Sequence, residues 1–191
     1  FLTGKTSSLG GIPHDEYGMT SLSVRAYVNS LAEKAGFQNE KTYKFQTGGP
    51  DGDLGSNEIL LSTDNEVYLG IVDGSGVLCD PEGLEKTELK RLAKERVMSC
   101  NYDKSKLSKR GFFVSVDDID VMLPNGSLVA NGTTFRNTFH YEVFKFVNHI
   151  DLFVPCGGRP NSIDLNNLHY FINKENNKCK IPYIVEGANL F

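Results

Sequence analysis

The chain has 191 residues, with 20 Lys and Arg, 24 Asp and Glu, and a formal net charge of −4. This length predicts a single domain, because domains run to about 100–200 residues. A composition of 39% hydrophobic and 23% charged residues excludes a disordered chain. The acidic balance argues against a nucleic-acid partner, and no apolar run approaches the about 18–20 residues of a membrane span. We therefore expect a globular protein that binds neither nucleic acid nor membrane.

The first part of the chain alternates between helical and strand patterns. Apolar residues at helical spacing predict the buried stripe of a helix that ends near Gly36. These residues are Val24, Tyr27, Val28, Leu31, Ala32 and Ala35. Next come a strand over 42–47, a helix over about 53–62 and a strand over 66–72. A charged, exposed helix is then expected over 84–96.

The second part continues this alternation. β-rich segments predict strands over 112–116, 128–130, 150–154 and 180–185. Helices that alternate with apolar strands indicate an α/β fold, here a Rossmann-like, mainly parallel sheet with helices on both faces. Two more helices are expected from apolar residues at helical spacing: Phe135, Phe139, Val143 and Phe146 on the first, and Leu165, Leu168, Phe171 and Ile172 on the second, which Asn161 and Ser162 can cap.

We expect residues 1–191 to form one dinucleotide-binding domain, with a leading segment and helix over 1–36 and the sheet over 42–191. The chain opens on Phe1 rather than Met, which predicts a segment of a longer protein. Its four cysteines form no C-x-x-C pair, and a chain of this size needs no disulfides. Buried free thiols are therefore expected, in an intracellular protein that is cytoplasmic or mitochondrial.

A glycine-rich turn links the first predicted strand to the helix after it, with the sequence T-G-G-P-D-G-D-L-G-S over 47–56. Gly52 and Gly55 have the spacing of the second and third glycines of the dinucleotide motif G-x-G-x-x-G, while Pro50 takes the first position. In that motif the second glycine lets the backbone approach a pyrophosphate, and the third lets the helix pack tightly on the strand. An ordinary strand-to-helix turn is the alternative. The cofactor-binding residues predicted here are Gly49, Gly52, Asp53, Leu54 and Gly55.

An acidic residue follows the second predicted strand. Asp73 lies about 20 residues after Gly52, where a carboxylate can accept hydrogen bonds from the adenosine ribose. No Lys or Arg lies within 69–78 to receive the extra phosphate of NADP, so this arrangement favours NAD. The alternative is that Asp73 only shapes an Asp-Gly turn. Asp51 and Asp53 would disfavour an anionic ligand unless they face solvent or cap the helix, and we expect Asp53 to be the cap.

Six motifs in order along the chain resemble those of one enzyme family. They are Leu2-Thr-Gly-Lys5 with Ser8-Leu-Gly-Gly11, Thr20-Ser-Leu-Ser-Val24, the glycine turn, Val72-Asp-Gly-Ser75 with Asp80-Pro-Glu-Gly83, Val154-Pro-Cys-Gly157 and Val185-Glu-Gly-Ala-Asn189. With these motifs the chain is similar to the cofactor domain of the glutamate dehydrogenases, in particular the large NAD-dependent enzymes of fungi. The resemblance covers nearly the whole chain.

The resemblance implies NAD-dependent oxidative deamination of L-glutamate to 2-oxoglutarate and ammonia by a parent enzyme that is a homo-oligomer. It implies that Thr20 approaches the nicotinamide amide and Asn189 the adjacent ribose, and that Pro155 and Cys156 border the adenosine side. The family's catalytic lysine lies in a separate substrate domain, which holds glutamate and 2-oxoglutarate. No catalytic residue is therefore expected within this chain, and the chain alone is expected to be inactive.

Three other functions stay open: a non-catalytic nucleotide-sensing Rossmann domain, an S-adenosylmethionine-dependent methyltransferase, and a structural domain used in assembly. The Glu186-Gly-Ala-Asn189 ending and the Thr20 segment argue against the methyltransferase. No metal site is expected, because the four histidines share no ligand spacing and the acidic turn over 117–120 has no second acidic cluster to complete a site.

Overall fold

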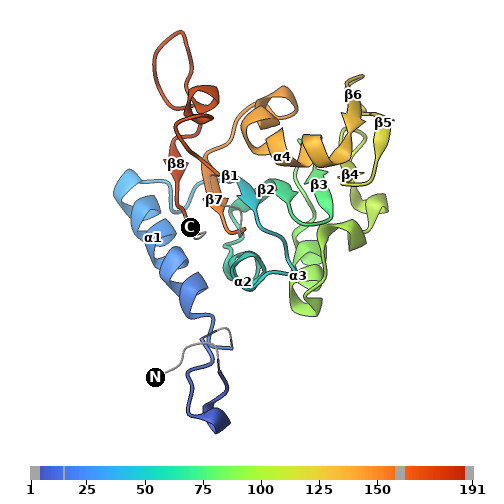
Figure 1. Ribbon diagram of the computed structural model, residues 1–191. Coiled ribbons are helices and arrows are strands. Elements are labelled where there is room, and N and C mark those ends of the chain that lie inside the picture. The colour runs from blue at the N-terminus through green and yellow to red at the C-terminus, as the bar shows by residue number, and fades with distance from the viewer. Residues whose placement is uncertain (1–4, 15, 158–161, 188–191) are drawn as a thin grey trace.

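The computed structural model describes residues 5–14, 16–157 and 162–187. Its helices are α1 (Met19–Ala35), α2 (Asp53–Leu61), α3 (Lys86–Glu95) and α4 (Gly132–Glu142). Its strands are β1 (Thr42–Thr47), β2 (Glu66–Val72), β3 (Gly76–Cys79), β4 (Phe112–Ser115), β5 (Ile119–Met122), β6 (Leu128–Asn131), β7 (Leu152–Pro155) and β8 (Tyr183–Ile184). Within these described ranges, six strands form one sheet, in the order β4-β3-β2-β1-β7-β8, with helices on both faces (Figure 1).

The centre of the sheet is parallel. β1 pairs in parallel with β2 on one side and with β7 on the other, and β7 pairs in parallel with β8. Because the chain leaves β1 for β2 and later returns to the opposite side as β7, the order of strands reverses beside β1. In open α/β sheets, ligands bind at such a reversal, beyond the carboxyl ends of the strands.

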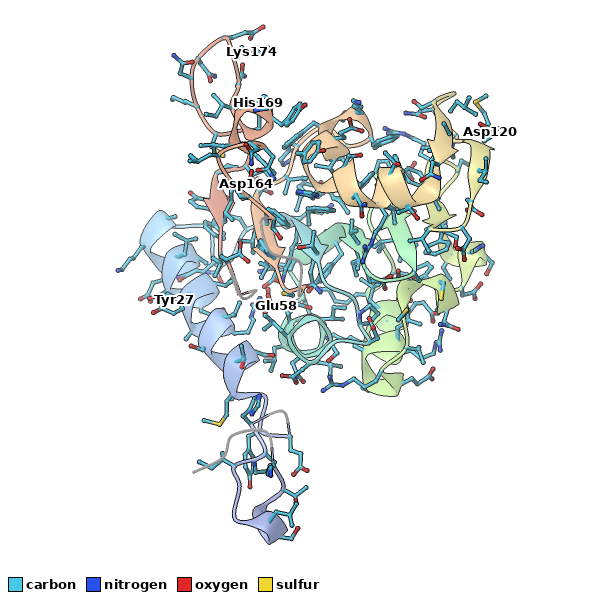
Figure 2. The ribbon with its side chains drawn as sticks, viewed as in Figure 1. Tyr27, Glu58, Asp120, Asp164, His169 and Lys174 are labelled. Atoms are coloured by element: carbon cyan, nitrogen blue, oxygen red, sulfur yellow. The ribbon has the colours of Figure 1, made fainter. Side chains whose placement is uncertain are left out.

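The other half of the sheet is antiparallel, which the sequence analysis did not predict. β3 pairs antiparallel with β2, and β4 pairs antiparallel with β3. The three residues between β2 and β3 are too few for the crossover that a parallel partner needs, so the chain turns straight back. β5 and β6 form a separate two-stranded sheet near α4, on which Asp120 is labelled in Figure 2.

One face of the sheet is covered by α4 through an aromatic core. The expected stripe is confirmed, because Phe135, Phe139, Val143 and Phe146 are all buried in one cluster. The rings of Phe135 and Phe139 lie 5.2 Å apart, and Phe139 also contacts Phe45 of β1 with ring centroids 5.9 Å apart. This packing fixes α4 over the middle of the sheet.

The opposite face carries α1, α2 and α3. α3 is less exposed than predicted, because Leu89, Leu92 and Ala93 are fully buried against Tyr68 and Leu78 of the sheet. In α1 the predicted stripe is partly wrong. Tyr27 is 70% exposed on the outer side of the helix (Figure 2). Ala35 is also exposed, while Arg25 is buried with Val24, Val28 and Ala32.

The helix expected after Ser162 is wrong. The described part of this segment contains only a short 3-10 turn, Leu168–Phe171, and Leu165 is 91% exposed. The carboxylate of Asp164 accepts hydrogen bonds from the backbone N–H groups of Asn166 and Asn167, which favours a turn over a helix. Phe171 still reaches the core, where it stacks on Phe153. Figure 2 labels Asp164, His169 and Lys174 along this segment between β7 and β8.

All four cysteines are free thiols. Cys79 and Cys156 are buried as expected, whereas Cys100 and Cys179 are exposed. In the described part of the chain, no helix combines the length and the apolar character that crossing a membrane requires.

Candidate functional site: a cavity at the carboxyl ends of the strands

A cavity of about 510 Å³ opens where the strand order reverses. Its walls come from the ends of β1, β2 and β7, from the glycine turn and from α4. This volume falls within the about 300–1,000 Å³ usual for small-molecule sites. The described lining residues are Thr47, Gly48, Gly49, Asp51, Gly52, Val72, Asp73, Gly74, Arg136, Asn137, His140, Cys156, Gly157 and Ser162.

Two glycines that precede the predicted motif make the turn. Gly48 has a φ of +88°, and a Cβ there would overlap the backbone of Cys156 and Gly157. A Cβ on Gly49 would overlap the carboxylate of Asp73 and come within 2.6 Å of Oδ1 of Asp51. Glycine is therefore required at Gly48 by the neighbouring backbone and is favoured at Gly49 by the side chains of Asp73 and Asp51, and the tight turn that Pro50 cannot provide is made at Gly48. The sequence analysis included Gly49 and missed Gly48.

The remaining glycines of the motif have different roles. A Cβ on Gly55 would overlap the carbonyl oxygen of Gly49 and lie 2.7 Å from that of Gly48, so Gly55 lets α2 pack against the turn. At Gly52 the nearest atom to an added Cβ is 3.6 Å away, and the residue is exposed. Protein packing thus does not require glycine at position 52, which is the position that the motif gives to close approach of a pyrophosphate.

The helix α2 begins beside the cavity without a side-chain cap. Its N-cap is Gly52, which has no side chain, and the described residues show no side-chain hydrogen bond from this cap position. Asp53 is therefore not the expected cap. Its Oδ1 accepts a hydrogen bond from Nδ2 of Asn57 at 3.1 Å and lies 3.7 Å from Nη2 of Arg96. The start of α2 offers N–H groups and a partial positive charge to an anion.

The carboxylate of Asp73 is fully engaged by the protein. The residue is 4% exposed. Its Oδ1 accepts hydrogen bonds from the backbone N and the hydroxyl of Ser75 at 2.8 and 2.6 Å, and its Oδ2 accepts one from the backbone N of Ser99 at 2.7 Å. These contacts hold the turn between β2 and β3, so they favour the turn-shaping alternative over a ribose contact.

The other carboxylate of the glycine turn lines the cavity. Burial raises the pKa of Asp51, and so does the neighbouring carboxylate of Asp73, while hydrogen bonds from the backbone of Asp51 and Gly52 partly oppose the shift. An anionic ligand would therefore bind beside a carboxylate whose negative charge repels it.

The third wall comes from α4 and was not predicted. Arg136 lines the cavity, and its Nε donates a hydrogen bond of 2.7 Å to the carbonyl oxygen of Asp73. Asn137 and His140 lie on the same wall, and burial lowers the pKa of His140, which a hydrogen bond to the backbone of Ser162 opposes. Arg136 lies 63 residues beyond Asp73, so residue spacing near the second strand does not indicate it.

The structure gathers some of the predicted site residues at the cavity and not others. Gly49, Gly52, Asp73 and Cys156 line it. Burial raises the pKa of the Cys156 thiol, which keeps it neutral. Four residues lie outside the lining: Asp53, Leu54 and Gly55 in α2, and Pro155 at the end of β7.

Of the two residues assigned to the nicotinamide half, the structure describes only Thr20. Thr20 is exposed in the first turn of α1 and does not line the cavity. Asn189 lies outside the described residues. The chain that leads to it continues the pairing of β8 beside β7, since the backbone N of Val185 donates to the carbonyl of Phe153 and that of Gly187 to the carbonyl of Pro155.

A second cavity, of about 540 Å³, lies at the opposite ends of the strands, between α1 and the starts of β1 and β2. Glu33, Glu40 and Glu66 line it, and no Lys or Arg is among its described lining residues. Glu66 is paired with Arg25 and Lys44, but Glu33 and Glu40 have no cation among the described lining residues and disfavour an anionic cofactor. The cavity beside the glycine turn is therefore the better candidate for a nucleotide site.

This fold and cavity place the chain among α/β proteins whose ligand cleft opens at the carboxyl ends of parallel strands. Residues 10–191 match the family model described as Glutamate/Leucine/Phenylalanine/Valine dehydrogenase. The chain therefore belongs to this dehydrogenase family, and the family resemblance inferred from its motifs is confirmed.

Curated relatives match the whole chain. It is 74% identical to the NAD-specific glutamate dehydrogenase of Saccharomyces cerevisiae and 60% identical to that of Neurospora crassa. It is also 53% identical to glutamate dehydrogenase 2 of Dictyostelium discoideum. The chain spans 18% of the length of each of these relatives.

Solved structures share the fold at low sequence identity. Glutamate dehydrogenase 2 of Plasmodium falciparum matches 99% of the chain with a TM-score of 0.61 and 22% identity, over 34% of that protein. The hetero-hexameric glutamate dehydrogenase of Thermus thermophilus matches 98% of the chain with a TM-score of 0.52 and 18% identity, over 35% of that protein. These matches show the mixed α/β fold with a mainly parallel sheet.

Proposed function

We propose that this chain is the Rossmann-like NAD-binding domain of an NAD-dependent glutamate dehydrogenase, which deaminates L-glutamate to 2-oxoglutarate and ammonia. The observation that carries the proposal is the glycine turn, which opens an uncapped helix into a cavity at the reversal of strand order. The NAD-specific glutamate dehydrogenases that match the whole chain support the cofactor and the reaction.

The residues present fit a dinucleotide. The first-turn N–H groups of α2 would receive the pyrophosphate, and the absent side chain at Gly52 would let it approach the backbone. Cys156, at the end of β7, would border the adenosine side. Thr20 and Asn189 remain assigned to the nicotinamide half by the family resemblance. When bound, NAD supplies the acceptor for the hydride that leaves the substrate.

No lysine in the described residues suits the proton transfer. Glutamate deamination needs a lysine with a lowered pKa beside the substrate. Burial alone would lower the pKa of Lys44, but Tyr68, Glu66 and Glu58 outweigh burial and raise it. Burial does lower the pKa of Lys86, yet its ammonium donates to the carbonyl of Thr63, at the amino end of β2 and away from the cavity.

The catalytic lysine and the groups that hold glutamate would then belong to a substrate domain outside this chain. We expect the 191-residue chain to bind NAD without oxidising glutamate, and we expect a homo-oligomeric parent enzyme. Glutamate turnover by the chain alone would contradict the first expectation, and its absence in the full-length protein would contradict the assigned reaction.

The binding test is an NMR titration of the chain with NAD. Amide resonances of Gly49, Gly52 and Cys156 are expected to shift together, whereas those around the second cavity, such as Glu33, should stay in place. Competition with ADP and with S-adenosylmethionine separates the alternatives. Displacement of NAD by ADP supports the proposal, whereas no NAD binding, or displacement by S-adenosylmethionine alone, refutes it.

A further inference from the structure

The charges around the cavity do not balance for a diphosphate. The glycine turn over 47–56 contains two aspartates and no Lys or Arg, and Asp51 lines the cavity beside Asp73. The start of α2 contributes only about half a positive charge. A pyrophosphate carries two negative charges, so a full cation is needed from another element.

Arg136 is the one Lys or Arg among the described residues that line the cavity. It is half-buried on α4, across the cavity from the glycine turn. Its Nε is held by the carbonyl oxygen of Asp73 at 2.7 Å, which restrains the plane of the guanidinium group. Within the described residues, its four terminal N–H groups have no acceptor and no carboxylate pairs with them. A partly buried guanidinium held by one edge is prepared to bind an anion through its other edge.

We propose that Arg136 binds the diphosphate bridge of the cofactor, so that the bridge is clamped between the start of α2 and the guanidinium group of α4. This inference rests on the proposed function, because it names a further residue of the same nucleotide site. The clamp would also offset the repulsion from Asp51. The aromatic packing of α4 on the sheet keeps Arg136 at a constant position relative to the turn.

The test compares three ligands on one variant. Arg136→Gln is expected to weaken the binding of NAD and of ADP about tenfold or more, because a charge-assisted pair is lost. The binding of adenosine, which has no phosphate, should stay unchanged. Isothermal titration calorimetry at constant ionic strength measures all three affinities. Arg110→Gln is the matched control, since Arg110 is exposed and does not line this cavity.

A second measurement does not depend on the variant remaining folded. In the unmodified protein, phenylglyoxal labels arginine side chains, and mass spectrometry locates the label. ADP is expected to protect Arg136 but not Arg110, and adenosine should protect neither.

The outcomes separate this inference from the proposed function. If Gly52→Ala weakens NAD binding but Arg136→Gln does not, the arginine clamp is wrong and the cofactor site stands. If Arg136→Gln weakens adenosine binding as much as ADP binding, the residue acts on the nucleoside and the clamp is again wrong. If the unmodified protein binds neither NAD nor ADP, the proposed function itself fails.

Discussion

Charged side chains are arranged differently at the two ends of the parallel strands. Toward the amino ends, Arg25, Lys44, Glu58 and Glu66 form a buried cluster in which each charge faces an opposite one. Nη1 of Arg25 lies 2.8 Å from Glu58, Nη2 lies 2.6 Å from Glu66, and Nζ of Lys44 lies 3.0 Å from Glu66 and contacts Glu58. At the carboxyl ends, Asp51 and Arg136 line an open cavity without such pairing.

The difference indicates what each end does. The cluster joins four elements, with Arg25 from α1, Lys44 from β1, Glu58 from α2 and Glu66 from β2, and Figure 2 shows Glu58 in the interior near α1 and α2. Its charges sum to zero, so it needs no ligand and fixes α1 against the sheet. At the cavity, α2 starts without a side-chain cap, and within the described residues the terminal N–H groups of Arg136 have no acceptor, which is the arrangement expected of a binding site.

The largest expected effect comes from breaking the cluster. Lys44→Met leaves Glu58 and Glu66 with one cation instead of two in a buried position, so the free energy of unfolding should fall by about 3–5 kcal/mol. Urea denaturation measures the change. Lys109→Met, at an exposed position, is the control and should change stability by less than about 0.5 kcal/mol. A loss of less than about 1 kcal/mol in Lys44→Met would show that charge pairing in the cluster does not stabilise the fold as proposed.

The second effect is a loss of stability in acid. Burial alone would raise the pKa of Glu66, but Lys44 and Arg25 outweigh it and hold the pKa at about 2, below the ordinary 4.5. Because the folded pKa is the lower one, the stabilisation is complete above about pH 5 and is lost as the pH falls toward 2. A shift of this size corresponds to about 3 kcal/mol.

Denaturation curves at pH 7, 5 and 3 test this dependence. Glu66→Gln removes the titrating group and should flatten the profile between pH 5 and 3, although the variant is less stable at pH 7. The same slope in the variant would mean that other carboxylates cause the acid sensitivity.

The third effect belongs to the cavity and concerns binding rather than stability. Gly52→Ala has room for the added methyl group, so the free energy of unfolding should stay within about 0.5 kcal/mol. NAD affinity should fall about tenfold, because the methyl group stands where the pyrophosphate approaches. Gly55→Ala is the matched contrast. Its methyl group overlaps backbone carbonyls and should destabilise the fold by about 1–3 kcal/mol. Unchanged NAD affinity in Gly52→Ala would remove Gly52 from the site.

The sequence predicted the elements whose patterns are local. The strands at 42–47 and 66–72, the helix at 53–62 and the aromatic stripe of α4 follow from residue spacing, and the structure has them at nearly these bounds. The glycine turn was recognised because its spacing lies within a few residues. Segments whose conformation depends on their packing were not predicted, such as the antiparallel β3 and the irregular 162–182.

Contacts across long stretches of chain could not be inferred. Arg25 did not belong to the predicted stripe of α1, and it is buried with Glu58 and Glu66, which lie 33 and 41 residues further along the chain. Arg136 joins the cavity through the packing of α4 on the sheet. In both cases the position of a charge is set by tertiary packing, which residue spacing does not contain.

The smallest expected effect concerns Thr47, at the end of β1 beside the cavity. The hydroxyl of Thr47 is buried and, in the described residues, has no hydrogen-bond partner, unlike the charges of the cluster. Thr47→Val keeps the shape and removes this unsatisfied group, so stability should be unchanged or rise by up to about 1 kcal/mol. Thr42→Val, at the other end of β1, is the control. The hydroxyl of Thr42 donates a hydrogen bond of 3.2 Å to the carbonyl of Glu40, so its removal should lower the free energy of unfolding. If Thr47→Val destabilises the protein as much as Thr42→Val, the hydroxyl has a partner in solution, and the two ends of β1 do not differ in how their polar groups are satisfied.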